Sequence, residues 1–393
     1  SGIKLREINY DFLSNKFQSK DKTVLSDHIT QGGLIQLSYQ QEPYSLVWAS
    51  RADGHLICFT YNREQEVEGW SRHPLGGSGI VESMTTIPNP DGDCDDLWMI
   101  VRRTINGTTK RYVEYLEVER IPGADVEDAF FVDCGLTLNN TQAATLTPAA
   151  TATADHSTGV VFTAGSAIFS AGDVGKEIHY RYTTTAVDES GISQTAYKTA
   201  KALITGYTDT THVTCTINAA FPSTATIASG GWRMTVTSIS GLSHLEGQTV
   251  QVLADGGSHP DCVVSGGSIT LNRPASKAQV GLSCPAKLQT MRLNAGGNDG
   301  TSQGKTARIN KAVVRVHESL GLKFGHRFDQ LDEVDFRTPL MDMDSPPDLF
   351  SGDLVLDWPG EYGTHPWLCF QADQPFPSTI IGVAPTVSTY DRG

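Results

Sequence analysis

The stretch LIQLSYQQEPYSLVWASRADGHLICFTY, residues 34–61, decides the fold class. It alternates runs rich in β-branched, aromatic and leucine residues with two segments, QQEPY and RADGH, whose composition is typical of turns. Gly54, in the second segment, lacks a Cβ and can adopt the positive φ angle that tight hairpins need. Residues 34–61 therefore predict three short strands.

A hairpin is predicted further along the chain. Residues 97–105 (LWMIVRRTI) and 111–118 (RYVEYLEV) flank the sequence NGTTK. An Asn-Gly pair between two β-rich runs is a strong hairpin signal, because both residues tolerate positive φ angles. Repeated strand–turn–strand units of this kind are typical of propeller blades and sandwiches.

Composition also favours a mainly β protein. The 393 residues include 38 glycines but only 6 methionines, and they are 39% hydrophobic and 19% charged, as in folded globular domains. Helices are expected to be short, with one at 24–30 and a turn near 82–86. No run approaches the roughly 18 apolar residues of a membrane helix, so no membrane anchor is expected. Because the start, SGI, is neither an initiator methionine nor a signal peptide, we expect sequence upstream.

The composition changes twice along the chain, which predicts three segments. Residues 1–133 and 244–393 would form one propeller-like β body, incomplete at its N-terminus. Residues 134–243, nearly neutral and rich in Thr, Ala, Ser and Gly, would form a small inserted β-sandwich. Strand-like runs in this insert are 177–185, 198–207, 212–218 and 232–238, and those in the second part of the body are 249–253, 268–272, 278–282, 286–293 and 307–317.

The charge argues against tight nucleic-acid binding. The net charge is −14, of which the three segments contribute −8, −1 and −5. Gripping DNA requires clustered Lys and Arg that displace counterions from phosphates, and no segment is basic. An acidic wall would instead repel phosphates and let DNA slide past it.

Seven cysteines are scattered without a C-x-x-C pair, at positions 58, 94, 134, 215, 262, 284 and 369. An odd number and wide spacing fit neither a disulfide framework nor a zinc site. We expect reduced, mostly buried thiols.

Two stretches resemble one protein family. Residues 46–72 fit the pattern W-x-x-R-x-D-G-x-L-x-x-x-T-Y-x-x-x-Q-x-V-x-x-W, and residues 241–256 read GLSHLEGQTVQVLADG. Both look like the tail nozzle, hub or packaged-DNA stabilisation proteins of tailed bacteriophages, as does QADQPFPSTIIGVAP at 371–385. The matched positions are Trp48, Arg51, Asp53, Gly54, Leu56, Thr60, Tyr61, Gln65, Val67 and Trp70.

The resemblance implies a virion protein of the tail, assembled in the bacterial host cytoplasm. It implies a propeller-like body, a ring of copies that retains and guides DNA, and contacts with neighbouring tail or portal-adaptor proteins, without enzymatic activity. The insert resembles the small FCCH-like β domain, with no ubiquitin chemistry implied. We interpret Trp48, Tyr61 and Trp70 as core anchors and Asp53-Gly54 as a turn.

Motifs that suggest catalysis or ligand binding fail on inspection. DGTSQGKTAR at 299–308 has Asp299 where a phosphate loop needs Gly, and a strand-like run follows it. HLE at 244–246 lacks the P-C-x-x-C partner of zinc deaminases. Asp91, Asp93, Asp95 and Asp96 lack the EF-hand glycine and glutamate, which predicts a solvated hairpin tip. GGSGI at 76–80 fails the nucleophile-elbow pattern. We therefore predict no catalytic residue, cofactor or metal.

Two further features leave alternatives open. Residues 329–348 carry seven acids (Asp329, Asp332, Glu333, Asp335, Asp342, Asp344 and Asp348) and three prolines, which predicts a solvated loop or, more specifically, part of a DNA channel lining. The alternative function is recognition of host-surface glycan by the insert, with Tyr180, Tyr182, Tyr197, Tyr207 and Trp232 as stacking surfaces. A tail-associated hydrolase would need a catalytic constellation, and none stands out.

Overall fold

The computed structural model describes residues 2–90, 92, 94–117, 123–187, 193–293, 305–337, 341 and 345–390. Strands make up 57% of the chain and helices 6%, which confirms the mainly β, propeller-like prediction. The chain divides into two compact units, one of Ser1–Glu119 with His244–Gln248 and the other of Arg120–Ser243 with Thr249–Gly393.

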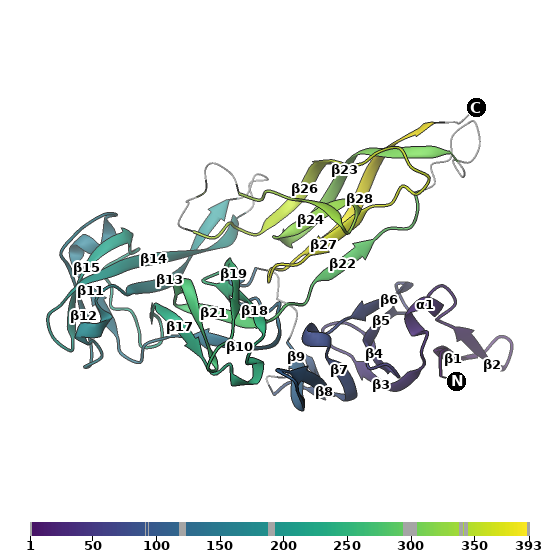
Figure 1. Ribbon diagram of the computed structural model, residues 1–393, viewed down its shortest axis with the longest axis horizontal. Helices are drawn as coiled ribbons and strands as arrows, with labels where there is room; N and C mark the ends of the chain where they lie inside the picture. Colours follow the sequence, from purple (N-terminus) through teal and green to yellow (C-terminus); the bar gives the residue numbers. More distant parts are fainter. Residues whose placement is uncertain are drawn as a thin grey trace. The chain divides into compact units, whose positions relative to one another are not determined.

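The first unit holds a hairpin and two larger antiparallel sheets (Figure 1). The hairpin pairs β1 (Arg6–Asp11) with β2 (Lys16–Asp21). The four-stranded sheet runs β3 (Leu34–Gln40), β4 (Leu46–Arg51), β5 (Leu56–Asn62) and β6 (Val67–His73). The three-stranded sheet runs β7 (Ile80–Pro88), β8 (Asp95–Ile105) and β9 (Thr108–Leu116). Two short helices complete it, α1 (Asp27–Thr30) and the 3-10 helix η1 (Gly76–Ser78).

Each of the two sheets is an up-and-down meander, and together they enclose one core. Alternate residues of β4 and β5 point to this core because successive strand side chains face opposite sides. Trp48, Leu56 and Cys58 from the first sheet pack with Met84 and Met99 from the second. Two meanders packed face to face in this way resemble adjacent propeller blades.

The predicted turns lie where the sequence placed them. Gly54 has φ +83° in the β4–β5 connection. Asn106 and Gly107, with φ 48° and 72°, form a two-residue loop between β8 and β9, and Ile105 pairs with Thr108 across it. The strand after this turn begins at Thr108 rather than 111, because the two-residue loop leaves Thr108–Lys110 free to pair with β8.

Two expectations for this unit were inaccurate. The helix expected at 24–30 is only α1, and residues 82–86 lie within β7 instead of forming a turn. Glu82 sits at an irregularity in the β7–β8 register between Val81 and Ser83. A bulge of this kind interrupts the alternation that marks a strand in the sequence.

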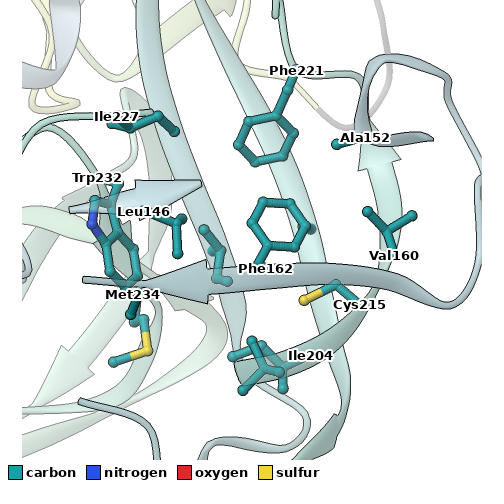
Figure 2. Close-up of a cluster of buried hydrophobic side chains, with 14 of the residues drawn as sticks. Leu146, Ala152, Val160, Phe162, Ile204, Cys215, Phe221, Ile227, Trp232 and Met234 are labelled. Carbon is teal, nitrogen blue, oxygen red and sulfur yellow. The ribbon is translucent and has the colours of Figure 1, made fainter. Parts of the chain in front are cut away.

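The second unit contains a six-stranded antiparallel sheet in the order β11-β12-β15-β14-β13-β16. Its strands are β11 (Leu146–Pro148), β12 (Val160–Ala164), β13 (Glu177–Val187), β14 (Ser193–Tyr207), β15 (His212–Ala219) and β16 (Arg233–Met234), with 3-10 helices η3 (Ala150–Thr153) and η4 (Ala171–Asp173) between them. Figure 2 shows the core of this sheet, where Phe162, Ile204, Phe221 and Trp232 converge.

Four further sheets complete the second unit. One joins β10 (Asp133–Asn139), β21 (Lys277–Leu282), β18 (Thr249–Ala254) and β19 (Gly257–Val263), and another pairs β17 (Val236–Ser240) with β20 (Ser268–Ala275). The others are β22 (Ala286–Gln289), β27 (Cys369–Ala372), β24 (Leu322–Arg327) and β25 (Gln330–Glu333), and β26 (Phe350–Asp357), β23 (Thr306–Ser319) and β28 (Thr379–Tyr390). The 3-10 helix η2 (Val126–Asp128) lies in a connection of this unit, and η5 (Ser243–Leu245) begins at its last residue before the segment His244–Gln248 of the first unit.

The chain leaves one sheet of this unit at the end of β10 and returns to the same sheet at β21, the strand that pairs with β10. Strand β10 pairs with β21, although 137 residues separate Asn139 from Lys277. The six-stranded sheet is built from residues between them, and its two ends meet where the Asn140 side chain donates a hydrogen bond to the carbonyl of Met234 (2.7 Å). The six-stranded sheet is therefore an excursion from the sheet that contains β10 and β21.

Candidate functional site

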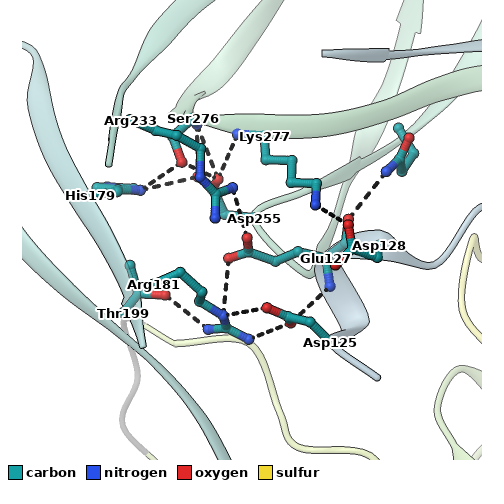
Figure 3. Close-up of polar contacts among 11 residues, drawn as sticks. Asp125, Glu127, Asp128, His179, Arg181, Thr199, Arg233, Asp255, Ser276 and Lys277 are labelled. Atoms are coloured by element: carbon teal, nitrogen blue, oxygen red, sulfur yellow. Dashed lines mark hydrogen bonds and ion pairs between the residues drawn. The ribbon is translucent and has the colours of Figure 1, made fainter. Parts of the chain in front are cut away.

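A buried network of ion pairs lies where the six-stranded sheet meets the β10-β21-β18-β19 sheet (Figure 3). Its acidic residues come from the connection around η2. Asp125 is the N-cap of this helix, and its carboxylate accepts a hydrogen bond from the Glu127 amide (3.1 Å). An N-cap carboxylate satisfies an amide that the helix leaves unpaired, so the turn presents Asp125 and Glu127 together.

Arg181, from β13, holds Asp125 in a bidentate pair. Its Nε and Nη2 donate to the two Asp125 carboxylate oxygens at 2.7 and 2.6 Å, and its Nη1 donates to Thr199 Oγ1 at 2.8 Å. Burial favours the neutral form of Asp125, but the hydrogen bonds and charge of Arg181 outweigh it and lower the pKa of Asp125. The planar guanidinium fits two carboxylate oxygens at once, which makes this contact directional.

Glu127 is the most deeply buried acid of the network. Its side chain is 2% exposed, and it forms ion pairs with Arg233 (2.8 Å) and with Arg181 (3.6 Å). Burial raises the pKa of Glu127, although the two arginines oppose that rise. Two acids and two arginines therefore balance one another in charge where the sheets meet.

A second cluster continues the network along the same junction. Asp255 accepts hydrogen bonds from the Ser276 hydroxyl (2.8 Å) and the Lys277 amide (2.9 Å), and the buried His179 contacts Ser276 Oγ (3.1 Å). Lys277 also pairs with Asp128. Asp255 and Gly256 have φ 48° and 76° in the β18–β19 turn, so the closing ADG of residues 241–256 both turns the chain and anchors this cluster.

The chemistry of the network is structural. Each of the four central charged groups is engaged by an opposite charge, whereas a general acid or base needs a free face toward a substrate. Removing one member would leave an uncompensated buried charge, which typically costs several kcal/mol. The network thus fixes how the six-stranded sheet is held against its neighbour.

The residues that carry the family resemblance have structural roles in the first unit. Trp48 is buried and donates from Nε1 to Gln40 Oε1 (2.7 Å), and Trp70 donates to the carbonyl of Lys22 (2.8 Å). Arg51 donates to the carbonyl of Ile29 (2.8 Å). Trp48 is therefore a core anchor, as interpreted, whereas Tyr61 and Trp70 are half-buried and lie outside the core cluster of this unit. The contacts of Trp70 and Arg51 tie the sheet to the segment that precedes it.

The other singled-out acids lie mainly in local contacts. Asp95 accepts hydrogen bonds from the amides of Gln41 (2.8 Å) and Glu42 (3.2 Å), and Asp96 is buried and accepts from Asn89. Asp91 and Asp93 lie outside the described residues. Asp96 is therefore not part of a solvated tip. In the described parts of the chain, no group of three or more His, Cys, Asp or Glu side chains is arranged to hold a metal.

The acidic run at 329–348 is partly a strand, since Gln330–Glu333 form β25. Asp329, Asp332, Glu333, Asp335 and Asp348 are exposed, while Asp342 and Asp344 lie outside the described residues. A cavity of about 160 Å³ lies beside this run, with Lys323, Phe336, Arg337 and Phe376 in its wall. Lys323 forms ion pairs with Glu333 (3.2 Å) and Asp373 (2.8 Å), so its charge is already balanced within the wall of the cavity.

Three other candidate motifs lie in ordinary strands, 3-10 helices or residues that are not described. In DGTSQGKTAR, residues 299–304 lie outside the described part, and Thr306 begins strand β23, as the strand-like run predicted. His244 and Leu245 of HLE lie in η5. Gly76–Ser78 of GGSGI form η1, and Ile80 begins β7.

The aromatic residues proposed as stacking surfaces in the insert are mostly part of its core. Trp232 is fully buried and donates from Nε1 to the carbonyl of Ala144 (2.7 Å). Tyr180 and Tyr182 stack on each other and pack against the same core. Tyr197 lies 5.6 Å from the Arg181 guanidinium, and Tyr207 is 38% exposed. The expectation that Trp232 forms a stacking surface is wrong, because its indole is buried in the hydrophobic core under the six-stranded sheet.

None of the seven cysteines is part of a disulfide bond. Four of them are buried, as predicted: Cys58, Cys94, Cys215 and Cys369. Burial raises the pKa of Cys58 and of Cys215 to about 12, which keeps both thiols protonated and unreactive. No helix within the described ranges is long and apolar enough to cross a membrane.

No sequence motif pointed to the ion-pair network. Asp125, Glu127, Arg181 and Arg233 are separated by up to about a hundred residues and fit no spacing motif. The only local signal is the acidic run Asp125–Asp128 before a β segment.

Comparisons with known proteins assign no family. No family model matches the chain, and no curated protein matches it. Among solved structures, an exo-β-1,3-galactanase from Phanerochaete chrysosporium, crystallised with β-1,3-galactotriose, is similar at 10% sequence identity and a TM-score of 0.14, over 90% of this chain and 95% of that one. A TM-score this low carries no argument about fold or activity.

Proposed function

We propose that this chain is a structural, non-catalytic protein of a bacteriophage tail, of the nozzle or packaged-DNA stabilisation type. Copies of it would form a ring around the DNA channel and contact neighbouring tail or portal-adaptor proteins. One observation carries the proposal. The residues of the W-x-x-R-x-D-G pattern, among them Trp48, Arg51 and Gly54, build the β3–β6 sheet of the first unit and its β4–β5 turn.

The buried charges support the same reading. A catalytic carboxylate pair in a hydrolase keeps one acid protonated and one free to attack or activate water. Here Asp125 and Glu127 are each paired with arginine in the junction between two sheets. Such a junction suits a part that transmits force or holds shape in a large assembly.

The surface charge defines how the protein would treat DNA. The chain carries −14 overall, and the run from Asp329 to Asp348 presents five exposed acids. A channel wall of this sign repels phosphates and prevents DNA from sticking. We propose that DNA passes the protein without being gripped.

Labelling of virus particles tests the proposal. Antibody against this chain, detected with gold in electron micrographs of the phage that encodes it, is expected on the tail of complete virions. Tail-less heads from the same lysate are the matched control and should remain unlabelled. Label confined to heads would refute the proposal. Absence of label from virions whose tails have been opened with mild denaturant would refute it as well.

A further inference from the structure

Residues 2–30, here called the arm, precede the four-stranded β3–β6 sheet of the first unit and contain the β1–β2 hairpin and α1 (Figure 1). Every residue of the arm is described, and none belongs to the core cluster of this unit, which includes Trp48 and Met99. Large apolar side chains of the arm are exposed instead, among them Phe12 (88%) and Leu25 (92%). Burial of apolar surface, usually the largest stabilising term in folding, therefore contributes little to holding the arm on the sheet.

Side chains of the sheet hold the arm by its backbone. Three of them donate hydrogen bonds to arm carbonyls: Trp70 to Lys22 (2.8 Å), Arg72 to His28 (2.7 Å) and Arg51 to Ile29 (2.8 Å). In addition, the Leu34 amide, at the start of β3, donates to the carbonyl of Gly2 (2.6 Å). Every residue has a backbone carbonyl, so these bonds depend on the path of the arm and not on its side chains. Any copy of the arm that takes the same path can accept them.

An ion-pair cluster adds side-chain contacts between the arm and the sheet. Lys22 of the arm pairs with Glu68 of β6 and with Glu7 of β1 (3.1 Å). Its ammonium lies 5.2 Å from the centre of the Tyr61 ring, and Arg63 pairs with Glu7 (3.5 Å). Hydrogen bonds and partly exposed ion pairs give a small net free energy, because water replaces them when they break. The arm can therefore leave the sheet while the core of the unit stays folded.

Two consecutive glycines connect the arm to the sheet. Gly32 has φ +112° and Gly33 has φ +91°, and β3 begins at the next residue, Leu34. Glycine adopts such angles without strain, and it adopts extended angles as readily. The same connection can therefore fold the arm back on its own sheet, as it does here, or extend and carry the arm away. Gly32 and Gly33 thus form a hinge between the arm and the sheet.

We infer that the arm is exchanged between copies of this chain. In the associated form, the arm of one copy leaves its own sheet and lies on the β3–β6 sheet of the next copy, where it makes the contacts described above. The structure shows both sides of that contact, so the partner of the sheet is a second copy of residues 2–30. Exchange of an identical element needs no new surface and is a low-cost route to assembly. This inference rests on the self-association included in the proposed function and names the element that performs it.

Crosslinking of isotope-labelled copies of the full chain tests the exchange. A carbodiimide joins a lysine amine to a carboxylate in contact with it, and Lys22 with Glu68 is such a pair between the arm and the sheet. Equal amounts of ¹⁴N and ¹⁵N protein are mixed at about 1 μM, concentrated to about 0.1 mM and separated by size before crosslinking. In associated copies, about half of the Lys22–Glu68 peptides should join the two isotopes, since each arm comes from another copy at random. In the monomer, every such peptide should carry one isotope.

Arg72→Met distinguishes exchange from an ordinary docking surface. The bond from Arg72 to His28 is present in both the closed and the exchanged form, so its loss cancels from the equilibrium between them but eases release of the arm. The association constant should stay nearly unchanged, while mixed-isotope crosslinks should appear about fivefold faster, as expected for the loss of one hydrogen bond. Arg111→Met is the matched control, since Arg111 pairs with Glu82 in the three-stranded sheet. A large loss of association in Arg72→Met alone would show a contact made only between copies and would overturn the inference.

A hinge variant should strengthen the association. Gly32→Ala strains the folded-back hinge at φ +112°, and its Cβ meets the Arg51 side chain only at ordinary contact distance, 3.5 Å. The extended hinge accepts alanine, so the association constant should rise about tenfold for each exchanged arm. Gly175→Ala is the matched control, because it has a φ of +94° and nothing within 4 Å of its Cβ but lies in the second unit. Weaker association in Gly32→Ala, or equal effects of the two alanines, would contradict a hinge.

Two results with the wild-type chain would also overturn the inference. One is a chain that stays monomeric up to about 0.1 mM, and the other is associated copies whose Lys22–Glu68 peptides all carry a single isotope. A chain that fails here yet labels the tail leaves the proposed function standing. A chain that exchanges its arm but is absent from the tail leaves this inference standing.

Discussion

Replacing Arg181 by methionine is the most direct test of the ion-pair network. The variant keeps an unbranched apolar side chain but removes the guanidinium that binds Asp125 through two hydrogen bonds. Asp125 would then retain only the amide of Glu127, and Glu127 would keep Arg233 as its one cation. The change leaves one negative charge without a partner in the junction between the sheets.

The size of the effect follows from burial. Breaking a buried pair by removing one partner typically costs about 3–5 kcal/mol, because the remaining charge is desolvated. The pair between Arg315 and Asp353 has the same bidentate geometry at 2.7 Å for both bonds, but its side chains are 63% and 43% exposed. Exposed pairs contribute roughly 0–1 kcal/mol, so Arg315→Met is the matched control.

Urea unfolding of the second unit, followed by hydrogen exchange of β13 and β18 with mass spectrometry, measures both variants. A second variant separates charge from packing. Arg181→Met combined with Asp125→Leu leaves Glu127 and Arg233 as a balanced pair and should regain most of the stability, since apolar replacements of buried pairs are often nearly neutral. Equal losses for Arg181→Met and Arg315→Met, or no recovery in the double variant, would show that the network does not hold the sheets.

Acid should reduce the difference between Arg181→Met and wild type. In wild type the folded-state pKa of Asp125 is lowered, so its stabilising contribution is present above the unfolded value near 3.9 and is lost as the pH falls through the folded value. In the variant, burial without Arg181 raises the folded-state pKa of the same acid, and protonation then relieves the unpaired charge. The stability deficit should therefore shrink as the pH falls from 7 toward 4.

Two further predictions concern the first unit. Burial lowers the pKa of His73 to about 4, so on acidification the unfolded chain takes up a proton before the folded chain does. The free energy of unfolding of this unit should therefore fall by up to about 3 kcal/mol between pH 6.5 and pH 4. His73→Phe should remove most of that pH dependence, measured by hydrogen exchange of β5 and β6. Gly54→Ala places a Cβ about 2.1 Å from Ile80 Cγ2 at a φ of +83°. Gly33→Ala, in the same unit, has a similar φ of +91° with nothing within 4 Å of its Cβ. In thermal unfolding the first should cost several kcal/mol and the second about 1 kcal/mol. A wild-type profile that is level across that pH range, or equal costs for the two alanines, would contradict the respective argument.

The sequence was sufficient to predict those structural features that depend only on residues close together in the chain. Asn106-Gly107 and Asp53-Gly54 predicted their turns because positive φ angles are a local requirement. The alternation in residues 34–61 predicted β3, β4 and β5 for the same reason. Strand β7 was missed because the irregularity at Glu82 breaks its alternation.

The candidate site could not be predicted in this way. Its charged residues come from a turn and two strands that meet only after the six-stranded sheet has folded, and a solvated acid has the same sequence signature as a buried one. Trp232 illustrates the reverse error. An aromatic residue in a strand suits either a binding face or a core, and the choice depends on what lies across the sheet.

The pairing of β10 with β21 has a consequence for the order of folding. An unstructured chain would have to close a loop of 137 residues to bring Asn139 beside Lys277. Once the six-stranded sheet has formed and its ends are joined at Asn140 and Met234, the loop that remains is about threefold shorter, which lowers the entropic cost of closure by about 1 kcal/mol. The six-stranded sheet is thus expected to fold early. By joining the two ends of its own segment, it would bring β10 and β21 close enough to pair in register.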